Sequence, residues 1–78
     1  MDIYDPTLKL ISEFISSKRF FLNDLETKIK DLGFIMRVAP TETVKDYLDW
    51  QVSDGILNKF IELDNPESPR LGYALVRE

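Results

Sequence analysis

The apolar positions of this chain follow a helical repeat in three segments and an alternating repeat near the C-terminus. In the segment 40–57, PTETVKDYLDWQVSDGIL, a spacing of about 100° per residue gathers one set of side chains on a single arc. Thr41 is expected to be the N-cap with Glu42 in the first turn, and Gly55 to end the helix in a left-handed conformation. The arc is predicted to face a core, and consists of Val44, Tyr47, Leu48, Gln51 and Val52.

The opposite face of this helix is predominantly acidic. It carries three carboxylates against one lysine, and its members are Glu42, Lys45, Asp46, Asp49 and Ser53. Trp50 is expected at the margin of the buried arc, about 60° beyond Tyr47. Two interpretations of Trp50 are open: it anchors an interface, or it covers Ile56 where the helix ends.

The first helix is predicted to begin at Asp5-Pro6, an N-cap followed by proline at the first helical position. Leu10 and Phe14 form a second apolar flank, so this helix either packs on two sides or provides a seam for a dimer or another partner. Its inner stripe is predicted to be Leu8, Ile11, Ser12 and Ile15.

A brief edge strand is expected at 20–22, followed by a second helix from about Asn23. Asn23 and Glu26 have the spacing of a capping box, and Gly33 is expected to end the helix with Phe34 folded back against it. The inner positions are predicted to be Leu25, Ile29 and Leu32.

Two further segments complete the chain. The connection 34–39 is apolar, so its Ile35 and Met36 either fill the core or meet a partner. Residues 56–63 alternate, with Leu57, Lys59, Ile61 and Leu63 on one side and Asn58, Phe60 and Glu62 on the other. After a loop at 64–72, a second strand at 73–77 is predicted to complete a β-hairpin with a long tip.

Length and composition favour one small domain, residues 1–78, with 44% hydrophobic residues and no apolar run long enough to span a bilayer. The start of the chain lacks the pattern of a signal peptide, so a cytoplasmic protein without membrane contact is expected. Cysteine and histidine are absent, which excludes disulfides and thiolate chemistry and removes the commonest general base. Glu42, Asp46 and Asp49 share a face without any calcium-loop pattern, so we expect a solvated acidic surface, no metal, no cofactor and no catalytic residue.

The order of elements, helix, short strand, helix, helix, strand, long loop and strand, resembles the winged-helix family over nearly the whole chain. The most specific match is Thr43-Val44 with Tyr47-Leu48, followed by Asp54-Gly55-Ile56-Leu57, which is similar to a recognition helix and its glycine-led strand. The resemblance implies an α+β fold, a three-helix cluster closed by a small antiparallel sheet with a hairpin wing. It also implies a setting in transcription or replication.

In DNA-binding members of that family, the outer face of the third helix enters the major groove and the hairpin tip touches the neighbouring backbone. Here the net charge is −4, and three carboxylates on the corresponding face would oppose the gain from counterion release. We therefore expect a non-enzymatic module that acts mainly through protein contacts. The protein-partner candidates are Leu10, Phe14, Ile35, Met36, Trp50, Asp46 and Asp49.

The alternative hypothesis is a DNA-binding transcriptional regulator that forms a homodimer through its first helix and touches DNA with its wing and second helix. The DNA-contact candidates are Lys28, Lys30, Arg37, Lys45, Lys59 and Arg70. Arg70 follows a proline in the predicted wing tip, which favours a backbone or minor-groove contact. Equally, Arg70 offsets Glu67 and Asp64 in a solvated loop.

Overall fold

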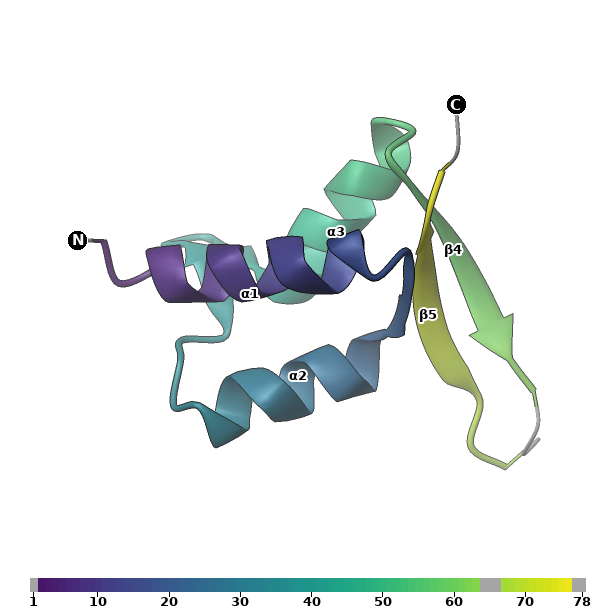
Figure 1. Cartoon of the computed structure of the whole chain (residues 1–78), viewed down its shortest axis with the longest axis horizontal. Helices are drawn as coiled ribbons and strands as arrows, with labels where there is room; N and C mark the ends of the chain where they lie inside the picture. The colour runs from purple at the N-terminus through teal and green to yellow at the C-terminus, as the bar shows by residue number, and fades with distance from the viewer. Residues whose placement is uncertain (1, 64–66, 77–78) are drawn as a thin grey trace.

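The computed structural model describes residues 2–63 and 67–76 and has the predicted α+β class (Figure 1). The helices are α1 (Asp5–Ser16), α2 (Leu22–Asp31) and α3 (Val44–Ser53). The strands are β1 (Arg19–Phe21), β2 (Arg37–Ala39), β3 (Glu42–Thr43), β4 (Leu57–Glu62) and β5 (Arg70–Leu75).

A three-stranded antiparallel sheet has the order β1-β5-β4, so the N-terminal strand β1 lies at one edge as predicted. Tyr73 of β5 is opposite Phe20 of β1 and Lys59 of β4. Figure 1 shows the helices gathered on one side of this sheet, with the β4–β5 hairpin reaching past them. The sheet therefore has one covered face and one open face.

The core lies between the helices and the covered face of the sheet. Leu25 and Ile29 of α2, Leu48 of α3, and Tyr73 are each 0% exposed. The Tyr73 ring also stacks on Phe20 with centroids 5.8 Å apart. Burial of side chains of this size stabilises a fold by about 1.5–3 kcal/mol each, so these residues hold α2, α3 and the sheet together.

Helices α2 and α3 end as the sequence predicts. Gly33 and Gly55 have φ angles of +73° and +79°, which only glycine adopts without strain. The Phe34 N–H donates to the Ile29 carbonyl at 3.0 Å, and the Ile56 N–H donates to the Gln51 carbonyl at 3.0 Å. These are the long hydrogen bonds of a Schellman motif.

The predicted N-cap of α3 is wrong because an additional hairpin precedes the helix. Strands β2 and β3 pair with each other, and Glu42 lies in β3 instead of in the first helical turn. Thr43, not Thr41, is the N-cap, and its Oγ1 accepts a hydrogen bond from the Asp46 N–H at 3.2 Å. Helix α3 is therefore shorter at its start than the sequence suggested.

The other two helices begin one or two residues earlier than predicted. Tyr4 is the N-cap of α1, so Asp5 is the first helical residue, although Pro6 lies in the first turn. Phe21 is the N-cap of α2, with no side-chain cap hydrogen bond, because β1 runs directly into the helix. The predicted capping box of Asn23 is therefore wrong.

Several inner positions differ from the sequence pattern. In α1, Ser12 is exposed, whereas Thr7 is buried and donates its hydroxyl to the Ile35 carbonyl at 2.6 Å. Leu32 is 46% exposed because it follows the last residue of α2. In β4, Leu57 is buried but Ile61 is 61% exposed, since the hairpin extends beyond the helices.

The second strand of the hairpin begins earlier than predicted. It spans Arg70–Leu75, so Arg70 is not in a loop tip but is the first residue of β5, opposite Glu62. The predicted loop residues 64–66 and the predicted strand residue Arg77 lie outside the described residues.

Candidate functional site: the outer surface of α3

Asp49 is the centre of a polar cluster on the outer surface of α3. Its Oδ1 accepts hydrogen bonds from the Tyr73 hydroxyl at 3.0 Å and from Lys59 Nζ at 2.9 Å. Its Oδ2 accepts from Lys45 Nζ at 2.9 Å. We call Lys45, Asp49, Lys59 and Tyr73 the Asp49 cluster. It joins α3 to both strands of the hairpin.

The cluster shifts the pKa values of Asp49 and Tyr73. Hydrogen bonds from Lys45, Lys59 and Tyr73, of which that from Lys45 has the largest effect, together lower the pKa of Asp49 to about 2 against the opposing effect of burial. Burial raises the pKa of the Tyr73 hydroxyl, and its hydrogen bond to the Asp49 carboxylate adds to that rise. Asp49 is thus ionised and Tyr73 neutral at ordinary pH, an arrangement suited to cohesion.

A second set of side chains lies beside this cluster on the same helix. Asp46, Trp50 and Asp54 follow one another at four-residue spacing, so each is displaced by about 40° around the helix axis from the one before. We call them the Trp50 strip. The Trp50 side chain is 59% exposed, and Asp46 and Asp54 are exposed as well. Neither carboxylate forms an ion pair with any residue that the structure describes.

Trp50 lies about 60° beyond the half-buried Tyr47 around the helix axis, as predicted, and its side chain is 59% exposed because the buried side of the helix is centred on Val44 and Leu48. Ile56 is itself 43% exposed, so Trp50 does not cover it completely. Of the two interpretations of Trp50, the exposed side chain fits the interface anchor.

The acidic face expected from the sequence is divided in two. Lys45 and Lys59 form ion pairs with Asp49, whereas Asp46 forms none with any described residue and interacts with Lys45 only at longer range. The four-residue spacing of Lys45 and Asp49 is a local signal for their ion pair. No local signal links Asp49 to Lys59 or Tyr73, which come from distant strands. Asp54 was not a candidate, although its spacing from Trp50 could have identified it.

The open face of the sheet carries two phenylalanines, each covered by an arginine. The Arg19 guanidinium lies 4.4 Å from the centroid of the Phe60 ring, and Arg70 lies 3.7 Å from that of Phe21. The two rings meet edge to face at 5.6 Å. A carboxylate completes each pair: Arg19 to Glu62 at 3.0 Å and Arg70 to Asp24 at 3.4 Å.

The remaining DNA-contact candidates are dispersed. Lys28 and Lys30 are exposed on α2 and have no ion-pair partner within the described ranges. Arg37 donates to the Pro40 carbonyl at 3.3 Å within the β2–β3 hairpin. Four other cations, Arg19, Lys45, Lys59 and Arg70, are all paired with carboxylates.

Most apolar partner candidates belong to the protein's own core. Leu10 is only 7% exposed, and Phe14 packs edge to face on Phe20 with centroids 5.8 Å apart. Met36 packs against the core and Ile35 is half-buried. Helix α1 therefore packs on two sides, and these residues leave Trp50 as the most exposed apolar candidate.

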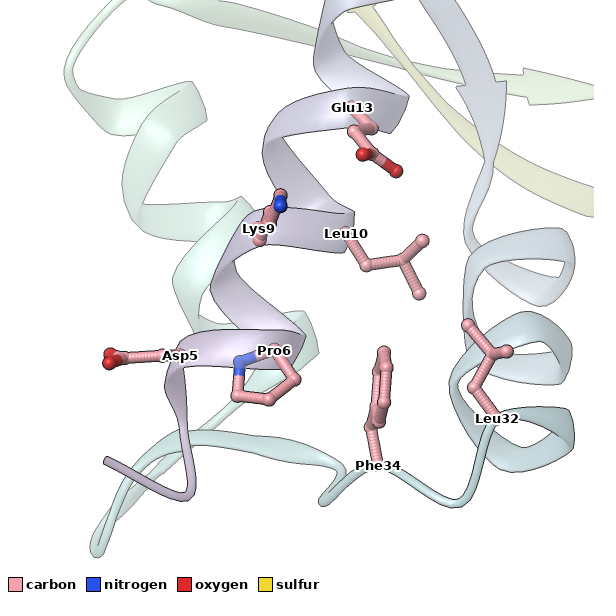
Figure 2. Close-up of a pocket in the computed structure, with 7 residues that line it drawn as sticks. All are labelled: Asp5, Pro6, Lys9, Leu10, Glu13, Leu32 and Phe34. Atoms are coloured by element: carbon pink, nitrogen blue, oxygen red, sulfur yellow. The ribbon is translucent and has the colours of Figure 1, made fainter. Parts of the chain in front are cut away.

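A groove of about 440 Å³ lies between α1 and α2. Figure 2 shows Leu10, Leu32 and Phe34 converging in it from the two helices and the segment after α2, while Asp5 points away. Lys9 and Glu13 lie on its α1 rim. The inner surface of the groove is formed by Leu10, Leu32 and Phe34, so it is suited mainly to apolar contact.

Within the part of the chain that the structure describes, no group of three or more acidic residues is placed to hold a metal ion. Among those same residues, no helix is long and apolar enough to cross a membrane. Comparisons of the chain with protein family models, with curated proteins and with solved structures find no match.

Proposed function

We propose that this chain is a non-enzymatic winged-helix module of a cytoplasmic, DNA-linked machinery in transcription or replication, and that it acts mainly through protein contacts. The order of elements and the sheet order β1-β5-β4 are compatible with a winged helix. The observation that carries the functional proposal is the Trp50 strip, an exposed tryptophan between two carboxylates that have no ion-pair partner in the described part of the chain.

The location of the strip argues against DNA as the main ligand. In a winged helix, Asp46 of the strip would lie on the face of α3 that DNA-binding members of the family direct into the major groove, with Trp50 and Asp54 beside it. Asp46 and Asp54 would there approach phosphates, and Lys45 and Lys59 are already paired with Asp49. DNA affinity depends on cations that release counterions, so this face is poorly suited to a duplex. Exposed tryptophan, in contrast, is among the residues most enriched at the centres of protein interfaces.

Photocrosslinking in cells tests the protein contact. A photoreactive phenylalanine analogue in place of Trp50 is expected to give a covalent adduct with a discrete protein, whereas the same analogue at Ser12, exposed on α1, gives none. Loss of the adduct in an Asp46→Lys background would tie the contact to the strip. An adduct that is equally strong from both positions, or absent from position 50, would contradict the proposal.

A DNA titration tests the expectation that the chain does not bind duplex DNA. Fluorescence anisotropy of a labelled duplex at low salt is expected to show no saturable, salt-dependent binding. An association constant whose logarithm falls linearly with the logarithm of the salt concentration would favour a DNA-binding protein instead.

The alternative, a dimeric DNA-binding regulator, draws support from Lys28 and Lys30, which are exposed on α2 and unpaired among the described residues. The groove beside α1 offers it a dimer contact. If this alternative holds, Lys28→Ala together with Arg70→Ala reduces the salt dependence of duplex binding, and the protein sediments as a dimer.

A further inference from the structure

We propose that the Trp50 strip binds an arginine-bearing segment of a partner protein, with the guanidinium stacked on the indole and its N–H groups directed to Asp46 or Asp54. This inference rests on the proposed function and specifies the chemistry of the partner. It starts from three properties of the strip: an exposed aromatic face, two flanking carboxylates and no covering cation within the described residues.

Charge complementarity indicates that the binding segment of the partner is positively charged. Asp46 and Asp54 lie one helical turn on either side of Trp50, and the chain as a whole has a net charge of −4. Nucleic acids and anionic membranes would be repelled by this surface. A cationic side chain would be attracted by both carboxylates, so the occupant is a basic protein segment.

The open face of the sheet shows how this protein satisfies the same combination of groups internally. Phe21 is followed three residues later by Asp24, and Arg70 stacks on the ring and pairs with the carboxylate. Phe60 is followed two residues later by Glu62, and Arg19 stacks on the Phe60 ring and pairs with the Glu62 carboxylate. Trp50 with Asp46 and Asp54 is a third aromatic ring with nearby carboxylates. No arginine among the described residues covers this ring, so we infer that the arginine comes from another chain.

Arginine fits the strip better than lysine. A guanidinium is planar, stacks on an aromatic face and presents several N–H donors at its edge, whereas an ammonium is a compact and strongly hydrated point charge. Tryptophan is also the best of the aromatic rings for this contact. A stacked guanidinium can therefore reach a carboxylate one turn away without leaving the indole.

The single tryptophan of the chain makes the test direct. The full chain, labelled with ¹⁵N, is titrated with three alanine-based helical peptides that are identical except for arginine, lysine or glutamate at the same three positions. The arginine peptide is expected to move the indole N–H resonance saturably and to bind at least threefold more tightly than the lysine peptide. The glutamate peptide is expected to leave the resonance unchanged.

Matched variants locate the site. Asp46→Asn with Asp54→Asn is expected to weaken the arginine peptide at least fivefold, whereas Asp31→Asn, which removes an exposed charge from the end of α2, changes its affinity less than twofold. Backbone resonances of the core report whether each variant remains folded.

Several results would overturn the inference. One is an arginine peptide that leaves the indole resonance in place, and another is equal affinity for the arginine and lysine peptides. Equal weakening by the strip variants and by Asp31→Asn would show attraction to net charge only. The proposed function fails separately, through the absence of a crosslink from position 50; a crosslinked partner together with an inert arginine peptide would refute only the arginine contact.

Discussion

The Asp49 cluster and the Trp50 strip lie side by side on α3, yet their carboxylates have opposite surroundings. Asp49 accepts three hydrogen bonds and its pKa is lowered to about 2. Asp46, three residues before it, has no ion-pair partner among the described residues. The cluster connects α3 to the hairpin, whereas the side chains of the strip form no hydrogen bond or ion pair with any residue that the structure describes. An aspartate thus holds α3 to the hairpin at position 49, whereas the aspartate at position 46 remains available to bind a partner.

The largest expected effect on stability comes from removing the buried ring of Tyr73 from the Asp49 cluster. Tyr73→Ala deletes a side chain that is 0% exposed and stacked on Phe20, so the free energy of unfolding should fall by about 3–5 kcal/mol. Urea denaturation followed by circular dichroism measures it. Tyr73→Phe keeps the ring and should cost only about 0.5–1.5 kcal/mol. A similar cost for both variants would mean that the hydroxyl, not the ring, holds the hairpin.

The comparison is tested most directly by truncating each carboxylate. Asp49→Ala leaves the Tyr73 hydroxyl without its partner and should lower the free energy of unfolding by about 1–3 kcal/mol. Asp46→Ala loses only a favourable charge in the first turn of α3 and should cost less than about 1 kcal/mol. Equal costs for the two variants would remove the distinction between cluster and strip.

Acidification should reveal the contribution of the Asp49 cluster, with a smaller effect. The pKa of Asp49 is about 2 in the folded protein against an ordinary value of 3.8, so its contribution to stability is present above about pH 4 and is lost as the pH falls toward 2. The free energy of unfolding of Asp49→Asn should therefore fall less between pH 6 and pH 2 than that of the natural chain. The difference is modest, because solvent screens a carboxylate that is 34% exposed.

The smallest effect on stability is expected at Trp50. Its side chain is 59% exposed, so Trp50→Ala should change the free energy of unfolding by no more than about 0.5 kcal/mol. The same variant should abolish the binding of the arginine peptide, followed through backbone amide resonances because the indole is gone. A loss comparable to that of Tyr73→Ala would show that the indole is part of the core and would leave the strip without its central group.

The sequence predicted the parts of the fold that have local causes. Gly33 and Gly55 end their helices because only glycine adopts the left-handed conformation without strain, and helical periodicity identified Leu25, Ile29 and Leu48 as core. The β2–β3 hairpin was missed because it is too short to show alternation. It displaced the start of α3 from Thr41 to Thr43.

The candidate site was less predictable, because pairing across the fold decides which charges remain free. Counting carboxylates on α3 treated Asp46 and Asp49 as equivalent, and only Lys45 was close enough in sequence to indicate otherwise. Lys59 and Tyr73 reach Asp49 from the hairpin through the register of β4 and β5. Likewise, Arg70 was expected in a loop and instead lies over Phe21 on the sheet.

The ring of Phe60 lies directly against the backbone of Gly72 on the neighbouring strand. A methyl group at position 72 would come within 2.3 Å of that ring, so any larger residue requires the phenylalanine to move or to be replaced. The two positions are therefore expected to change together during evolution: chains descended from a common ancestor with this one should have a smaller residue at position 60 wherever glycine is lost at position 72. The absence of a side chain at Gly72 makes room for the Phe60 ring, so substitutions in β5 and β4 are expected to be coupled.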